Sequence, residues 1–233
     1  MTNYILEYWD KIQSGEILVC KRIRQQYEKL VDDIHNPKEP YVFDMDLANK
    51  PIVFIETFCM QAQGKNMGKP LKLDLFQKAK IQAIFGFVHK DTKMRQYREA
   101  MTIIGRKNGK TTENSALALF MTIGDGEGSS EAYFIATKKD QANKGFDESH
   151  KMMQQSPLLR KHLKKRQGDI YFPPTYSKIQ ALASDSNTLD GLNSHFVIID
   201  ELAAIKDRNL YDVMVQSTSS RDQALISSIS TNG

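Results

Sequence analysis

Hydrophobic and polar residues alternate along the chain in blocks that predict strands followed by helices. Apolar positions three to four residues apart indicate helices, and short continuous apolar runs indicate buried strands. The predicted order is a helix near 74–87, a strand near 100–104, a helix near 111–123, a strand near 132–136, a helix near 139–155, a less regular part, a strand at 196–199, a helix near 209–216 and a strand at 224–230. This alternation indicates an α/β fold with a mainly parallel central sheet flanked by helices.

The N-terminal part of the chain has a different pattern. Residues 4–34 have helical periodicity that Ser14-Gly15 interrupts, whereas the run Lys50–Cys59 fits either a strand or a short helix. The Gly- and Lys-rich segment Gln61–Lys69 then marks a predicted boundary. We therefore expect a mostly helical N-terminal arm over residues 1–65 and a main core over residues 66–233.

Composition adds exclusions to this picture. The apolar runs are far shorter than the roughly 20 residues of a membrane helix, and the first ten residues lack the basic start of a secretory signal. Cys20 and Cys59 lie far apart in the sequence, which argues against a disulfide framework and a cysteine zinc site. The sequence thus predicts a cytoplasmic globular protein with no membrane partner.

Charge is unevenly distributed along the chain. The formal net charge is +4, yet residues 138–166 contain nine Lys or Arg against three acids. Arg160, Lys161, Lys164 and Lys165 have the spacing of one helical face, which would meet DNA phosphates or a neighbouring subunit. A solvated helix face explains the same pattern equally well.

The segment Ile104-Gly-Arg-Lys-Asn-Gly-Lys-Thr111 stands between a predicted strand and a predicted helix. Backbone amides in such a loop surround a phosphate, a lysine reaches the β/γ oxygens and a hydroxyl holds Mg²⁺. Lys110 and Thr111 fit these two roles. The usual pattern has glycine where this chain has Ile104, so the motif is a variant of the phosphate-binding loop (P-loop). A basic turn that caps a helix is the alternative.

A P-loop requires an acidic partner at the end of a buried strand. Phe196-Val-Ile-Ile-Asp200-Glu201 supplies one, because four apolar residues lead into two carboxylates. In this reading Asp200 serves Mg²⁺, and Glu201 orients or deprotonates the attacking water. A water-activating carboxylate favours nucleotide hydrolysis over phosphoryl transfer to a metabolite. In isolation, an acidic helix start after a core strand explains the pair as well.

Several segments in this order resemble the large terminase subunits of tailed double-stranded DNA phages. They are Leu75–Lys78, Arg106–Thr111, Ala136–Ala142, Leu189–Asn193, Ile199–Leu202 and Ile229–Gly233. The resemblance covers the chain from about Phe58 onward. It implies a P-loop NTPase fold of the additional-strand, RecA/helicase-like class, with ATP and Mg²⁺ as cofactors.

The resemblance also implies roles for individual residues. Gln77 would read the adenine edge. Arg106 would contact the γ-phosphate in cis. The catalytic groups would be Arg106, Lys110 and Glu201. Thr111 and Asp200 would hold the metal. Ser230, Thr231 and Asn232 match the family's coupling motif. The expected nucleotide-binding residues are Gln77, Gly105, Arg106, Lys107, Asn108, Gly109, Lys110, Thr111 and Thr112.

The resemblance further implies partners. Family members form a homo-oligomeric ring on the portal protein of an empty capsid, act with a small terminase subunit and move double-stranded DNA independently of its sequence. The chain would then work in the host cytoplasm and transiently at the procapsid portal vertex, as a ring when assembled and as a monomer in isolation. A neighbouring subunit is expected to insert an arginine, for which Arg160, Arg208 and Arg221 are candidates.

Large terminases normally continue into a nuclease domain, and no nuclease-like acidic cluster precedes residue 233, so we expect no DNA cleavage from this chain. Two other functions remain open at this point. One is a helicase-like NTPase that acts on nucleic acid. The other is a non-catalytic nucleotide-binding assembly module, which Ile104 in the loop favours.

Overall fold

The computed structural model describes residues 1–183, 189, 191–202 and 208–231. Contacts group the chain into two compact units. The first combines Met1–Val53 with Lys72–Tyr97, and the second combines Phe54–Leu71 with Arg98–Gly233. This division differs from the arm and core drawn at residue 65, because the chain returns to the first unit after Leu71. No described helix is long and apolar enough to cross a bilayer.

The first unit is built from helices and one short strand pair. Its elements are α1 (Tyr4–Gln13), α2 (Lys21–His35), β1 (Tyr41–Phe43), α4 (Leu75–Gly86) and β2 (Phe87–His89), together with the start of α3 (Met45–Phe58). Strands β1 and β2 pair antiparallel. The open choice for residues 50–59 is thus settled as helix, since α3 covers nearly all of them.

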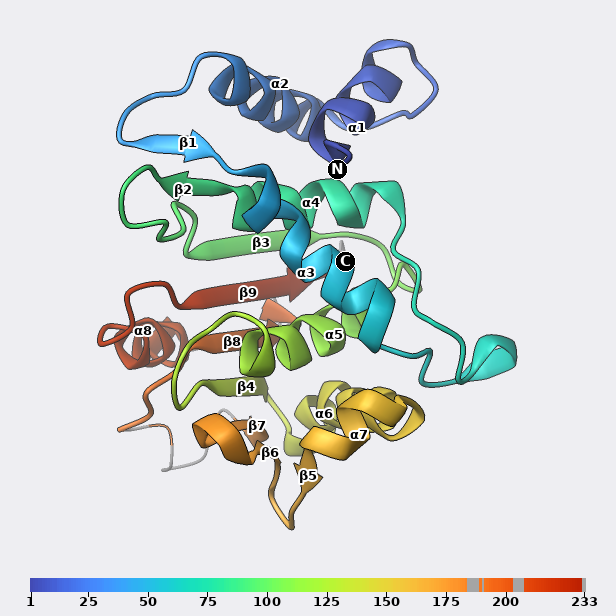
Figure 1. The fold of residues 1–233 in the computed structure, drawn as a ribbon, viewed down its shortest axis with the longest axis vertical. Coiled ribbons are helices and arrows are strands. Elements are labelled where there is room, and N and C mark those ends of the chain that lie inside the picture. Colours follow the sequence, from blue (N-terminus) through green and yellow to red (C-terminus); the bar gives the residue numbers. More distant parts are fainter. Residues whose placement is uncertain (184–188, 190, 203–207, 232–233) are drawn as a thin grey trace. The chain divides into compact units, whose positions relative to one another are not determined.

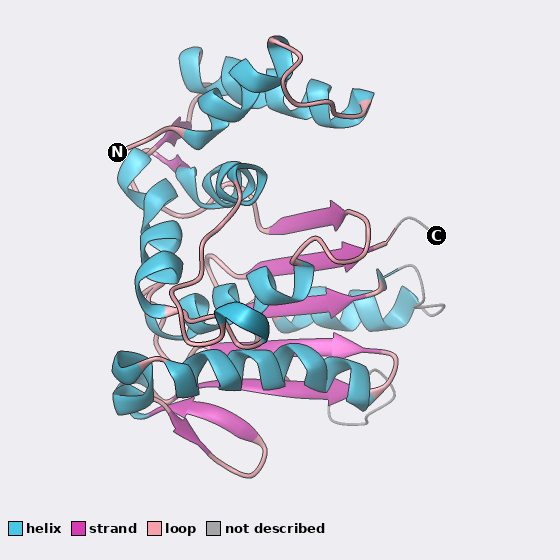
Figure 2. Ribbon diagram, turned by 90° about the vertical axis from the view of Figure 1, so that its right-hand side faces the viewer, coloured by secondary structure: helices cyan, strands magenta, loops and turns pink. Residues whose placement is uncertain are grey.

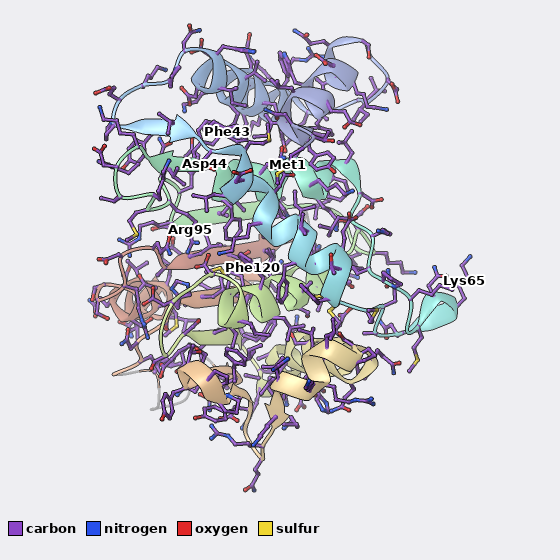
Figure 3. The ribbon with its side chains drawn as sticks, in the orientation of Figure 1. Met1, Phe43, Asp44, Lys65, Arg95 and Phe120 are labelled. Carbon is purple, nitrogen blue, oxygen red and sulfur yellow. The ribbon has the colours of Figure 1, made fainter. Side chains whose placement is uncertain are left out.

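One face of α1 forms the core of this unit. Ile5, Tyr8, Trp9 and Ile12 are buried at helical spacing, and they pack with buried residues of α2 and α4. Elsewhere in the unit, Phe43 (Figure 3) lies close over the backbone of α4 at Gly86, where an added Cβ would come within 2.4 Å of the ring. This close approach explains the glycine at the end of α4.

The second unit is an α/β sheet domain (Figure 1). Its strands are β3 (Glu99–Ile103), β4 (Glu131–Ala136), β5 (Lys164–Lys165), β6 (Asp169–Phe172), β7 (Ser177–Ala183), β8 (Phe196–Asp200) and β9 (Leu225–Ser230). Its helices are the end of α3, α5 (Lys110–Ile123), α6 (Lys139–Gln155), α7 (Pro157–His162) and α8 (Arg208–Ser217), with 3-10 turns at Gly64–Asn66 and Pro173–Thr175.

The seven strands form one sheet in the order β3-β9-β8-β4-β7-β6-β5. The first five are parallel to their neighbours, and β6 and β5 run antiparallel at one side. The parallel strands therefore end at a common edge, which we call the carboxyl edge (Figure 2). The prediction of an α/β fold with a mainly parallel sheet is confirmed. Strand β9, last in sequence, lies between β3 and β8.

Helices cover both faces of this sheet. Helices α5 and α6 pack on one face, and Leu210 and Met214 of α8 pack on the other against buried residues of β4, β8 and β9. The contact of α6 with the sheet is close, since a Cβ on Gly145 would come within 2.4 Å of the Phe134 ring. Because both faces are covered, β8 and β9 are buried along nearly their whole length.

The antiparallel part of the sheet was not predicted. Residues 157–183, left as a less regular part between predicted elements, contain α7, β5, β6 and β7. Strand β7 nevertheless joins the parallel part through β4, whereas β6 and β5 fold back beside it. The basic residues in this region therefore have a different geometry from the predicted one. Helix α7 ends at His162, and Lys164 and Lys165 form β5, so the predicted single helical face is wrong.

Candidate functional site

The phosphate-loop motif connects the end of β3 to the start of α5, as predicted. Two of its residues, Lys107 and Gly109, have left-handed backbone conformations with φ of 64° and 73°. Gly109 is the residue before the first turn of α5, where glycine adopts this conformation without steric cost. The loop thus delivers the chain directly to a helix N-terminus, a place that favours an anion.

Lys110 ties the two ends of the loop together. Its Nζ donates to the carbonyl oxygen of Ile104 at 2.7 Å and to that of Gly105 at 3.3 Å. Ile104 contributes only its carbonyl to this contact, and its φ is not positive. The departure from glycine at this position therefore leaves the loop geometry intact, which removes the structural reason for regarding the motif as defective.

Asn108 closes the tip of the loop. Its Nδ2 donates to the carbonyl oxygens of Gly105 and Arg106, both at 3.2 Å. The side chains of Arg106 and Lys107 are exposed in the same loop. Two flexible cations therefore stand beside the backbone segment that the motif assigns to phosphate.

The predicted acidic pair lies at the end of β8. Asp200 is the last residue of that strand, and Glu201 follows it with φ of 55°. Left-handed backbone in a residue other than glycine is uncommon, costs about 1 kcal/mol or more and clusters at functional sites. Glu201 is exposed, so its carboxylate faces solvent at the carboxyl edge.

Asp200 has an unusual electrostatic environment. Burial raises the pKa of its carboxyl above the ordinary value, and the neighbouring Glu201 charge raises it further. A hydrogen bond with the Gln141 side chain and the positive charge of Lys110 act in the opposite direction. The acidic pair and the loop lysine thus belong to one electrostatic cluster.

A small cavity joins the two motifs. Its lining includes Thr111 at the start of α5, Gln141 at the start of α6 and Asp200 at the end of β8. A hydroxyl and a carboxylate are hard oxygen donors of the kind that Mg²⁺ prefers, and Mg²⁺ usually takes only one or two protein ligands. The residues present therefore fit a nucleotide-bound magnesium ion.

Strand β9 brings the predicted coupling motif to the same edge. Ser230 pairs in register with Ile103 of β3, and Ile229 pairs with Asp200 of β8. The Ile104 amide also donates to the Ser230 carbonyl at 3.2 Å. Ser230 therefore lies between the P-loop strand and the acidic strand. Thr231 follows it, and Asn232 lies outside the described residues.

Two predicted nucleotide-binding residues have other contacts. The Thr112 hydroxyl donates to Glu148 of α6 at 2.5 Å, so this side chain ties α5 to α6. Gln77 lies in the first unit at the start of α4, where its Oε1 accepts the Asp74 amide at 2.9 Å in a capping box. Its side chain is buried.

The sequence missed some residues that organise the site. Asn114 of α5 donates to the Lys110 carbonyl at 2.9 Å, and its Oδ1 accepts the Ser227 hydroxyl of β9 at 2.7 Å. These contacts connect the first turn of α5 to the coupling strand. Gln141 belongs to a motif noted in the sequence, but nothing there indicated that it bonds to Asp200. No local sequence pattern predicts contacts between residues this far apart in the chain.

The three candidate arginines differ in their surroundings. Arg221 is buried, and its five N–H groups donate to acceptors on Glu127, Gly128, Ser129 and Asn193. A residue used in this way is structural, so Arg221 is a wrong candidate for insertion into a neighbour. Arg160 is exposed at the end of α7. The Arg208 side chain lies outside what the structure describes.

Comparisons with known proteins agree with these motifs. The sequence profile of the family described as "Terminase large subunit, ATPase domain" matches residues 75–233. The large terminase subunit of Enterobacteria phage HK97 is 28% identical over 192 residues, which cover 80% of this chain and 37% of that protein. The chain thus spans little more than a third of this relative.

The chain is also similar to solved structures. The crystal structure of the HK97 bacteriophage large terminase matches with a TM-score of 0.67 and 25% identity, over 78% of this chain and 37% of that chain. The large terminase ATPase domain of Thermus phage P74-26 has a TM-score of 0.49 and 20% identity, over 58% of this chain and 60% of that chain.

Proposed function

Because the chain belongs to the family of terminase large subunit ATPase domains, we propose that it is the motor domain of a phage packaging machine, in which ATP hydrolysis drives double-stranded DNA into a procapsid. The observation that carries the proposal is the order of three strands at the carboxyl edge. The P-loop follows β3, the acidic pair ends β8, and the coupling strand β9 lies between them.

The loop residues would bind and orient the nucleotide. Lys110 would exchange its contact with the Ile104 carbonyl for phosphate oxygens, while the amides before α5 hold the β-phosphate. Arg106, exposed at the loop tip, would reach the γ-phosphate. Gln77 would read the adenine through its Nε2 group, because the capping contact uses Oε1.

Thr111 and the two carboxylates would position the metal ion and the attacking water. Thr111 and Asp200 would hold Mg²⁺, which when bound neutralises charge on the β- and γ-phosphates. Glu201 would orient the attacking water and accept its proton. Glu201 directly follows the strand end with left-handed backbone, so its carboxylate would face the last phosphate of a nucleotide bound to the loop.

Strand β9 would pass the hydrolysis signal onward. Ser230 ends β9, which is hydrogen-bonded to both β3 and β8, and Thr231 and Asn232 come next in the sequence. A change on either side therefore acts on β9 directly. We propose a homo-oligomeric ring at the portal vertex in the host cytoplasm, with portal protein and small terminase subunit as partners. Of the described candidates, Arg160 is the exposed arginine left to act on a neighbour.

The first test asks whether ATP hydrolysis depends on the loop lysine. Lys110→Ala is expected to lower Mg²⁺-dependent ATP hydrolysis about 100-fold or more, because it removes a cation that stabilises transferring phosphate. Lys144→Ala, which removes an exposed lysine of α6, is the matched control and is expected to retain full activity. Equal activity in the two variants would contradict the site.

The second test measures how DNA affects ATP hydrolysis, and it distinguishes the packaging motor from the two alternative functions. Hydrolysis by the wild-type chain is expected to rise with double-stranded DNA and to rise further when portal protein is added. Stimulation by single strands with unwinding would instead identify a helicase-like NTPase. Tight ATP binding without hydrolysis at any protein concentration, even with portal and DNA, would identify an assembly module.

A further inference from the structure

One side of the sheet domain carries a dense cluster of positive charge. Residues 157–168 contain five Lys or Arg and no Asp or Glu. The five residues lie on the last turn of α7, on β5 and just after it; they are Arg160, Lys161, Lys164, Lys165 and Arg166, and we call them the basic edge. All five are exposed.

The basic edge lies at the outer limit of the sheet. Strand β5 is the last strand in the sheet order, on the side opposite β3. In both ribbon views the β5–β6 hairpin projects from the body of the sheet domain (Figures 1 and 2). A projecting surface is accessible to a long polyanion.

The charges of the basic edge are only partly neutralised. Arg166 donates to Asp169 at 2.5 and 2.7 Å and stacks on Tyr171 at 3.8 Å, which fixes the turn of the hairpin. In contrast, within the described part of the chain no carboxylate lies within ion-pair distance of Arg160, Lys161 or Lys164. The anchored arginine therefore supports a set of cations that have no acidic partner of their own.

Local structure explains part of this charge. Lysines on an edge strand prevent pairing with other strands, which accounts for Lys164 and Lys165. Cations in the last turn of a helix interact favourably with its dipole, which accounts for Arg160 and Lys161. Neither effect explains why twelve consecutive residues contain no acid. A surface that binds a polyanion requires clustered cations and also the absence of acids, because a nearby acid would repel phosphates.

We propose that the basic edge contacts the phosphate backbone of double-stranded DNA. The proposal rests on the packaging function above and assigns to it a contact surface. Lysines and arginines on a short strand and a single helical turn reach phosphates, but they present no element to a groove, so the contact is independent of base sequence. A second copy of the chain is the alternative occupant.

The experiment measures DNA affinity as a function of salt. Lys164→Gln combined with Lys165→Gln is expected to lower the slope of log affinity against log salt by about 2, that is, about 1 for each lost phosphate contact. Adding Lys161→Gln is expected to lower it further. Lys21→Gln with Arg22→Gln, an exposed pair on α2, removes the same charge elsewhere and is expected to leave the slope unchanged.

The outcomes separate this proposal from the proposed function. Basal ATP hydrolysis without DNA is expected to be equal in all these variants, and circular dichroism reports whether each one folds. Equal salt slopes for the basic-edge pair and the α2 pair would overturn the proposal, as would a wild-type chain that binds no DNA. A basic-edge variant that changes the sedimentation of the protein but not its DNA affinity would also overturn it, in favour of a contact between copies.

Discussion

The two ends of the parallel strands in the sheet domain carry polar groups in contrasting states. At the amino ends, Arg221 is buried and all five of its N–H groups have acceptors, while the buried His195 Nε2 lies 2.7 Å from Asp125. At the carboxyl ends, Lys107 and Glu201 have left-handed backbone and exposed side chains.

This contrast helps to distinguish residues that stabilise the fold from residues that act on a ligand. A buried group whose donors are all used has nothing left to offer a ligand, so its role is to hold loops together. A group in a strained conformation with an exposed charge stabilises the fold poorly and has a role only when something binds. The same residue types thus occur at both ends of the sheet, and their hydrogen bonding tells them apart.

The largest stability effect is expected at the amino ends. Arg221→Ala leaves Glu127 and several backbone carbonyls without their donor, which we expect to lower the free energy of unfolding by about 3–5 kcal/mol. Urea unfolding measures this loss. The contrast between the two ends would be broken if the variant kept wild-type stability and lost ATP hydrolysis at a temperature where it is folded.

A smaller, pH-dependent effect is expected at Glu148, which lies beside the P-loop helix. Burial raises the pKa of this carboxyl above its ordinary value of 4.5, and the hydrogen bond from Thr112 opposes the shift. Above pH 4.5 the folded protein therefore holds this proton more tightly than the unfolded chain does. The free energy of unfolding should fall as the pH rises towards the folded pKa.

Glu148→Gln removes this titration and keeps an oxygen for the Thr112 hydroxyl. Urea unfolding at a series of pH values is expected to give a flatter profile for the variant, so that its stability improves relative to wild type as the pH rises through this window. A wild-type profile as flat as that of the variant would show that the carboxyl titrates normally and that its burial has no electrostatic cost.

The sequence predicted long, regular helices and strands better than short ones. Helix α6 has the predicted bounds of Lys139 and Gln155, because its apolar periodicity is long and regular. Residues 50–59 stayed ambiguous, since a short apolar run fits a strand or a buried helix. Strands β5 and β6 are two and four residues long, which is too short for a pattern to emerge.

The site was predictable to the extent that its motifs are local. The P-loop residues and the pair Asp200-Glu201 are contiguous, so their spacing alone indicated their chemistry. The contacts of Arg221 join residues 28 to 94 positions apart, and the bond between Asn114 and Ser227 spans 113 positions. Such pairs depend on strand order, which no local pattern specifies, so the sequence alone did not separate Arg221 from the other two candidates for insertion into a neighbour.

The central claim is that Glu201 is the catalytic carboxylate of an ATPase. The most direct test is single-turnover ATP hydrolysis by Glu201→Gln, with nucleotide affinity measured in parallel and Asp222→Asn, an exposed acid at the amino end of the sheet, as the control. The account predicts that Glu201→Gln binds ATP normally and hydrolyses it about 10²- to 10⁴-fold more slowly, while the control retains the wild-type rate. Unchanged hydrolysis in Glu201→Gln would contradict it.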